Sequence, residues 1–165
     1  MRKVIITAAL TGGGRSGKAL NPDHPEQPKE IGQAAHECFN EGAAVVHLHA
    51  RDKNGVPTGS VEIFREIHEL IRAKCNIIIQ DSTGGGSNLT LDERLQCLDA
   101  GPEMASLNMG TMLRVLKKSP SIEKDKYQDS IWKNRREDIE RFASEMLKRN
   151  IKPEMEVYHH GMLGP

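Results

Sequence analysis

The feature that most constrains this chain is a repeated pattern. A short apolar run ends in glycines or polar residues, and a helix-like segment follows. The apolar runs cover residues 4–9, 44–49 and 76–80, and a weaker one covers 103–107. Pro28 suits the first turn of a helix, Ser60 suits an N-cap, and residues 90–93 form a capping box. Strand and helix segments that alternate at this spacing indicate a parallel sheet.

The position of the polar residues distinguishes two parallel architectures. Glycine-rich or ligand-like residues follow all four runs, and a barrel assembles its site from the ends of many strands. A doubly wound sheet concentrates its ligand at one switch point. The pattern therefore favours an α/β fold of the β/α (TIM) barrel type. With a fifth strand at residues 154–158, the barrel is incomplete, with about five βα units of eight.

Two segments between the fourth and fifth strands carry further expectations. Residues 117–129 are polar and contain Pro120, so we expect a mobile excursion there. Ser130 is expected to cap a long amphipathic helix with a buried face made of Ile139, Phe142, Ala143 and Met146.

Composition narrows the class of protein. The 165 residues suffice for one domain, expected to cover residues 1–165, as the N-terminal portion of a barrel. Lys and Arg together equal Asp and Glu at 23 each, so no net charge favours nucleic acid or an anionic membrane. The three cysteines are scattered, which favours reduced thiols. No apolar run reaches the roughly 20 residues of a membrane span, so we expect a cytoplasmic protein.

The second run ends in His47-Leu48-His49-Ala50-Arg51, which indicates a metal site. Side chains alternate between the faces of a strand, so His47 and His49 point the same way. Two imidazoles at one strand end can offer two nitrogen donors to one ion, and zinc is the first candidate. A pair of satisfied core histidines is the alternative, but an apolar strand gains nothing from such a pair. At least one further ligand is required.

Other polar residues at the strand ends are candidate ligand contacts. Residues 12–14 and 84–86 are glycine triplets that could bring backbone N–H groups to an anion, but neither fits the Walker A or dinucleotide pattern. Ser82 and Thr83 add hydroxyl groups to the second triplet, which favours a carboxylate or carbonyl site. Arg51 could hold Asp52, a substrate acid or the barrel rim. Glu154 and Glu156 share one face of the fifth strand, and Glu156, nearer its end, is the better functional candidate.

Four motifs together resemble one known family, the beta-keto acid cleavage enzymes. They run through the whole chain at residues 46–51, 82–86, 106–110 and 152–158. The resemblance implies a zinc-dependent β/α barrel that condenses a β-keto acid with acetyl-CoA and releases acetoacetate and a new acyl-CoA. It implies zinc ligands at His47 and His49, a loop at Ser82 and its glycine neighbours that holds the keto acid, and a pocket-lining glutamate at Glu156. With the residues themselves, this predicts catalytic roles for Glu156 and Ser82. The predicted substrate site comprises Ser82, Thr83, Gly84, Gly85, Ser106, Asn108 and Arg51.

The resemblance also marks departures from the family pattern. The family's third zinc ligand is a glutamate followed by a catalytic aspartate, with an arginine upstream, and this motif has no counterpart in the 165 residues. The chain reads His159-His160-Gly161 where the family tends to carry an Asp-x-Gly turn.

Two other readings remain open at this point. A metal-dependent amidohydrolase also places a His-x-His pair on a strand, and the pair His159-His160 could mimic a later ligand. An inactive barrel fragment that acts only through association is the non-enzyme alternative. Such an open barrel would leave inward positions uncovered, so a homo-oligomer or a complementing C-terminal half is expected. The inward positions are expected to include Val45, Ile77, Ile79 and Val157.

Overall fold

The centre of the molecule is a five-stranded parallel sheet in a computed structural model. The structure describes residues 3–14, 17–18, 21–86, 89–117 and 127–163. The strands of the sheet lie in the order of the chain: β1 (Thr7–Ala9), β2 (Val45–Leu48), β5 (Ile78–Asp81), β6 (Met104–Asn108) and β9 (Lys152–Glu156). A doubly wound sheet reverses its strand order at a switch point, and this sheet does not. The predicted α/β fold with a parallel sheet is confirmed.

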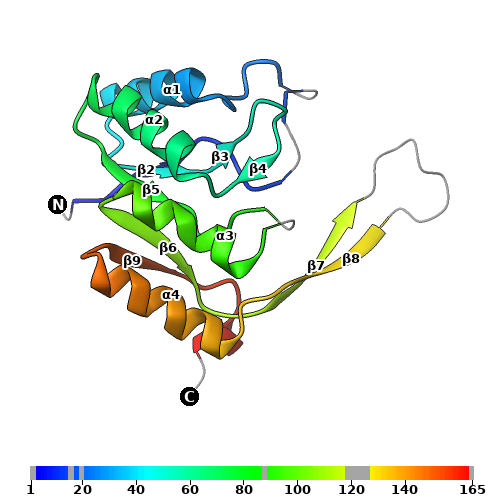
Figure 1. The fold of residues 1–165 in the computed structure, drawn as a ribbon. Helices are drawn as coiled ribbons and strands as arrows, with labels where there is room; N and C mark the ends of the chain where they lie inside the picture. Colours follow the sequence, from blue (N-terminus) through cyan, green and yellow to red (C-terminus); the bar gives the residue numbers. More distant parts are fainter. Residues whose placement is uncertain (1–2, 15–16, 19–20, 87–88, 118–126, 164–165) are drawn as a thin grey trace.

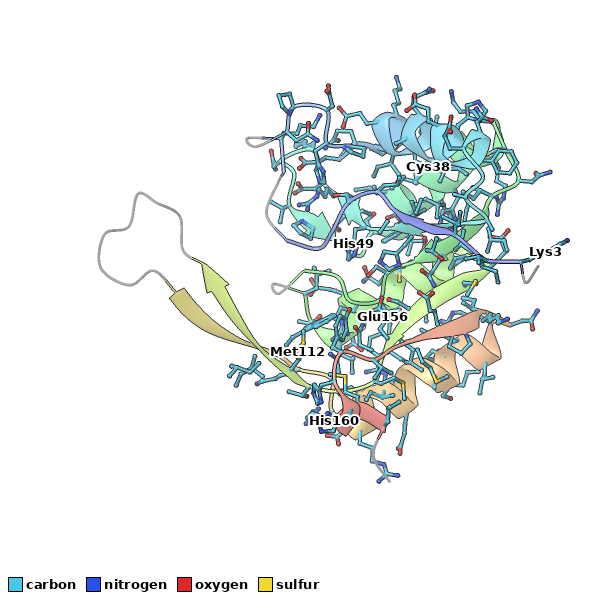
Figure 2. The ribbon with its side chains drawn as sticks, turned by 180° about the vertical axis from the view of Figure 1, so that it is seen from behind. Lys3, Cys38, His49, Met112, Glu156 and His160 are labelled. Carbon is cyan, nitrogen blue, oxygen red and sulfur yellow. The ribbon has the colours of Figure 1, made fainter. Side chains whose placement is uncertain are left out.

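Helices connect the strands and cover one side of the sheet, while Figure 2 views the molecule from the opposite side (Figures 1 and 2). They are α1 (Pro28–Asn40), α2 (Val61–Arg72), α3 (Leu91–Leu95) with the 3₁₀ helix η1 (Gln96–Ala100), and α4 (Arg136–Lys148). Two start signals work as predicted. Ser60 accepts a hydrogen bond from the backbone of Ile63, and Thr90 forms a capping box with Glu93.

The core lies between the sheet and the helices. Alternate residues of each central strand enter it, among them Leu48, Ile79 and Leu107, and they meet Phe64 and Ile67 of α2. Ile77 and Ile79 were expected on the opposite face, and this expectation is wrong. Gln80 pairs with His47 across the sheet, so its neighbour Ile79 must point to the helices.

A two-stranded antiparallel ribbon replaces the predicted excursion and the start of the last helix. It pairs β7 (Met112–Lys117) with β8 (Tyr127–Trp132) and extends away from the body (Figure 1). Ser130 is a residue of β8, where its backbone pairs with Arg114, so it caps no helix. Helix α4 starts six residues later because Asp138 accepts a hydrogen bond from the backbone of Arg135. The rest of the predicted excursion, residues 118–126, lies outside the described residues.

The remaining elements are short. The first strand starts at Thr7 rather than at residue 4, and β9 covers Lys152–Glu156 rather than 154–158. A small hairpin of β3 (Ala50–Arg51) and β4 (Pro57–Thr58) follows β2, and the 3₁₀ helix η2 (His160–Leu163) follows β9. Within the described part of the chain, no helix is both long and apolar enough to span a membrane.

Candidate metal and substrate site

The predicted site residues of four neighbouring strands lie on the face opposite the helices. His47 of β2 is paired in register with Gln80 of β5, and Asn108 of β6 is paired with Glu156 of β9. Figure 2 shows His49 and Glu156 near the middle of this side of the molecule. Because the strands are parallel, all of their carboxyl ends meet at one edge, where the loops also gather.

The two histidines of the predicted metal pair face each other through their ring nitrogens. Nε2 of His47 lies 3.3 Å from Nε2 of His49, and the rings are 68° from coplanar. Desolvation, followed in importance by the nearby His47 and Arg51, lowers the pKa of His49 to about 3. His49 is therefore neutral at physiological pH, which is the state in which an imidazole nitrogen can bind a metal.

Two carboxylates complete a cluster with His47. Ligand atoms of His47, Glu154 and Glu156 all lie within 4.8 Å of one another, and this is the only such group of three that the described residues form. His159 and His160, the ligand pair of the amidohydrolase alternative, are exposed and belong to no such group in the described part of the chain. The cluster can hold a divalent cation with nitrogen and oxygen donors.

Gln80 connects two members of the cluster, His47 and Glu154, and is not among the predicted site residues. This fully buried side chain lies 2.8 Å from Nδ1 of His47 through Oε1, and its Nε2 donates to Glu154 over 2.6 Å. The available signal was its position, directly before Asp81 at the end of an apolar strand. Polarity at a core-like position indicates a specific partner.

The loop after β5 is held rigidly. Thr83 is fully buried, and its hydroxyl donates to the carbonyl of Ser106 over 2.6 Å. The hydroxyl of Ser82 accepts from the backbone N–H of Gly84. Gly85 has a φ of +55°, which favours glycine. Thr83 and Ser106 thus fix the loop, and their contact with substrate stays a prediction.

The first glycine loop touches this second loop above His49. A Cβ on Gly13 would lie 1.9 Å from the carbonyl oxygen of Gly85 and 3.2 Å from the His49 ring. A Cβ on Gly12 or on Gly14 would instead point into open space. Glycine is therefore required at position 13 by a close approach of two backbones, next to a proposed metal ligand.

The amide of Asn108 is a candidate for a polar contact with a ligand. Its side chain is buried, and neither the amide nitrogen nor the amide oxygen has a hydrogen-bond partner among the described residues. Buried amides are normally paired because an unpaired one costs about 1–3 kcal/mol. The amide lies beside Gly84, at the centre of the predicted substrate site.

Arg51 joins two loops rather than an acid. It donates to the carbonyls of Gly12 and Gly55, at 2.6 and 2.8 Å, and its side chain is buried. The carboxylate of Asp52 accepts instead from the backbone of Asn54 and Val56. Of the three roles considered for Arg51, the geometry favours the one at the rim, and contact with substrate stays a prediction.

An aromatic pair that was not predicted from the sequence borders Glu156. Tyr158 donates its hydroxyl to Glu156 over 3.0 Å, and its ring packs edge-on to Trp132 with centroids 5.7 Å apart. Trp132 also reaches the backbone at Gly84. Because Trp132 ends the ribbon strand β8, the unpredicted ribbon supplies one wall of the site.

A buried acid lies directly behind the site. Asp81 accepts a hydrogen bond from Nε2 of His68 over 2.9 Å and is fully buried. Burial raises the pKa of Asp81 to about 6, although His68 offsets part of this rise. Asp81 belongs to the helix side of β5, so it supports the strand rather than the ligand face.

Comparison with known proteins identifies the family. The family model of the beta-keto acid cleavage enzymes matches residues 3–164. The chain belongs to the beta-keto acid cleavage enzyme family. The predicted resemblance is thereby confirmed, and it covers the four motifs that carry the site.

Two curated relatives of this family are 3-keto-5-aminohexanoate cleavage enzymes. The enzyme of Fusobacterium nucleatum subsp. nucleatum is 39% identical over 99% of this chain and 56% of its own length. The enzyme of Acetoanaerobium sticklandii is 38% identical over 99% of this chain and 55% of its own length. The chain thus spans about half the length of these relatives.

A solved structure supports the fold. The ternary complex of ObcA with C4-CoA adduct and oxalate has a TM-score of 0.65 with this chain at 19% identity, over 86% of this chain and 32% of that chain. At this identity the likeness concerns the arrangement of the strands and helices alone.

Proposed function

We propose that this chain carries the zinc-binding and keto-acid-binding part of a beta-keto acid cleavage enzyme. The reaction condenses a β-keto acid with acetyl-CoA and yields acetoacetate and the acyl-CoA of the remaining skeleton. The observation that carries the proposal is the facing pair His47 and His49 beside Glu154 and Glu156. Membership of the family supports the same reaction.

The donor set fits zinc. Two nitrogens bound to one tetrahedral zinc ion, each at about 2.0–2.1 Å, lie about 3.3 Å apart. The two Nε2 atoms of His47 and His49 have this separation. Glu154 offers an oxygen donor within reach of His47, and Glu156, in the same group, stays available for another role. Histidine nitrogens and carboxylate oxygens are both accepted by zinc.

When bound, zinc would supply Lewis-acid polarisation of the keto acid's oxygens. The chain's own residues bind and orient the substrate. The unpaired amide of Asn108 offers its N–H₂ to a substrate oxygen, and the hydroxyl of Ser82, which accepts from the backbone N–H of Gly84, keeps its own hydrogen to donate at the same strand end. Fixed donors of this kind stabilise negative charge that develops during the reaction.

Glu156 is the proposed proton-handling group of this chain. It lies on the ligand face, and its carboxylate is oriented by the hydroxyl of Tyr158. Glu156 lies in the same cluster as His47. A substrate held at the metal would therefore bring its carbon-bound proton close to the Glu156 carboxylate. Ser82 is proposed to contact the reacting carboxylate or ketone with its hydroxyl.

The substrate is proposed as a β-keto acid in general. The relatives' names include a 3,5-dioxohexanoate:acetyl-CoA acetone transferase from Paraburkholderia graminis and a 3-oxoadipate:acetyl-CoA acetyltransferase from Cupriavidus necator. These acids share the 3-keto acid end and differ in the rest of the molecule. The shared end matches the donors found here, and acetyl-CoA is the proposed co-substrate.

We further propose that the sheet is an arc of a β/α barrel, formed by residues 1–165 as one domain, and that its two edges pair with further strands. The edges bear exposed apolar side chains: Val4 and Ile5 are 82% and 75% exposed beside β1, and Met155 of β9 is 67% exposed. Such edges are templates for association. The partner is a further segment of barrel or a second copy. Sedimentation should therefore show that the chain self-associates, or that it becomes monodisperse only with a complementing half. A monodisperse monomer that melts cooperatively and is active would contradict this proposal.

Zinc binding tests the proposed function. The double variant His47→Ala, His49→Ala should lose zinc measured by equilibrium dialysis and metal analysis. The matched control His159→Ala, His160→Ala removes an exposed histidine pair and should keep the wild-type zinc content. Equal zinc content in the wild type and the His47, His49 variant would refute the proposal.

A further inference from the structure

Gln80 is placed between a proposed metal ligand and a carboxylate. It lies on β5, in register with His47 of β2, and its side chain is fully buried. Oε1 is 2.8 Å from Nδ1 of His47, and Nε2 is 2.6 Å from Oε2 of Glu154. Three side chains from β2, β5 and β9 thus form one continuous chain of contacts across the sheet.

The chemistry of the three groups fixes the direction of both hydrogen bonds. The amide N–H₂ of Gln80 donates to Oε2 of Glu154, so the amide oxygen is the group that faces His47. A carbonyl oxygen only accepts hydrogen bonds. Nδ1 of His47 must therefore carry the hydrogen.

This direction decides which nitrogen of His47 can bind a metal. A neutral imidazole has one N–H and one free lone pair. With the hydrogen on Nδ1, the lone pair of His47 is on Nε2, the atom that faces Nε2 of His49 at 3.3 Å. In the opposite tautomer, the hydrogen on Nε2 would occupy the position between the two rings.

The choice of glutamine at this position has a physical reason. A carboxylate in place of Gln80 would lie within hydrogen-bond distance of the Glu154 carboxylate, and two ionised acids so close repel each other. A leucine would fill the space but would leave both neighbours without their partner. Only a neutral group that accepts on one side and donates on the other satisfies both His47 and Glu154.

We propose that Gln80 is the positioning residue of the metal site, and that the chain Glu154–Gln80–His47 holds His47 as its Nδ1–H tautomer with Nε2 free for the metal. This inference rests on the proposed function for the identity of the metal. Partners behind a metal-bound histidine typically change metal affinity by about 10–100-fold when they are removed.

The test combines two readouts on the full chain. The first is the ¹⁵N spectrum of the imidazoles without metal, with the His47 signals assigned by their loss in His47→Ala. The wild type should show His47 protonated at Nδ1, and Gln80→Leu should show a mixture of tautomers. The second is zinc affinity by competition with a chromophoric chelator, where Gln80→Leu should bind about 10–100-fold more weakly.

A second variant keeps the test decisive if Gln80→Leu does not fold. Gln80→Met has a similar length, lacks both hydrogen-bonding groups and places no second acid beside Glu154, so it should show the same mixture of tautomers and the same loss of zinc affinity. A wild-type His47 protonated at Nε2 would overturn the inference, as would unchanged zinc affinity in Gln80→Leu. A wild type that binds no zinc would overturn the proposed function instead, and the tautomer, read without metal, would still decide the role of Gln80.

Discussion

The two faces of the parallel sheet use the same strands for opposite purposes. On β5, Ile79 points to the helices and is 2% exposed, while its neighbour Ile78 points to the other side and is 40% exposed. Apart from Asp81, the helix face of the central strands is apolar and packs against α2. The ligand face carries His47, Gln80 and Glu154, which bind one another. Strand alternation alone separates the two groups.

The difference shows where stability and chemistry are placed. Burial of aliphatic side chains on the helix face stabilises the fold at roughly 25 cal/mol per Å² of apolar surface. On the ligand face, polar groups are satisfied by specific partners, and the unpaired ones, such as the Asn108 amide, mark where a ligand is expected. Substitutions on the two faces should therefore have separable effects.

The largest expected effect comes from the helix face. Ile79→Ala should lower the free energy of unfolding by about 2–5 kcal/mol because it removes buried methylene groups and leaves a cavity. The matched control is Ile78→Ala, because the neighbouring Ile78 side chain is 40% exposed. This control should lower the free energy of unfolding by less than about 1 kcal/mol. Urea denaturation measures both. Equal losses at the two positions would mean that the faces are not distinct.

A second, smaller effect concerns the buried acid behind the site. The pKa of Asp81 in the fold, about 6, lies above the unfolded value of 3.8, so the folded protein binds this proton more tightly. The corresponding stability is complete below pH 4 and is lost as the pH rises through 6. By linkage the loss amounts to about 2–3 kcal/mol.

Asp81→Asn should remove this dependence, because an amide does not ionise and can still accept from His68. Urea denaturation of both proteins between pH 4 and 7 gives the difference, in which the titration of groups that do not interact with Asp81 cancels. If the free energy of unfolding changes with pH in the same way in the wild type and in Asp81→Asn, burial does not raise the pKa of Asp81.

The third effect tests the contact between the two glycine loops. Gly13→Ala places a methyl group 1.9 Å from the Gly85 carbonyl, so the loops must separate, at a cost of about 1–3 kcal/mol. The matched control is Gly14→Ala, where the same methyl group meets open space. Thermal unfolding measures the difference. If Gly13→Ala and Gly14→Ala have the same melting temperature, the two loops do not constrain each other over His49.

The sequence predicted what depends on local pattern and residue type. The parallel sheet followed from the alternation of apolar runs with helical segments, and the caps at Ser60 and Thr90 followed from side-chain chemistry. The His47 and His49 pair followed from strand alternation. Together these placed the ligand-bearing strand ends at one edge of the sheet.

What the sequence could not predict depends on contacts between distant segments. The ribbon of β7 and β8 arises from pairing between residues up to twenty apart, and the polar composition of its second strand concealed it. Gln80 acquires its role only when β2 and β9 lie within reach of β5. The face of Ile79 was misjudged because register, which decides it, is set by the neighbouring strand.

X-ray absorption at the zinc edge identifies the atoms bound to the metal. Zinc bound to this chain should have two imidazole nitrogens at about 2.0–2.1 Å, with oxygen ligands in the remaining positions. This signature should disappear in His47→Ala, His49→Ala and persist in His159→Ala, His160→Ala. Sulfur ligands at about 2.3 Å from Cys38, Cys75 or Cys97, or a signature unchanged by the loss of His47 and His49, would contradict the proposed zinc site.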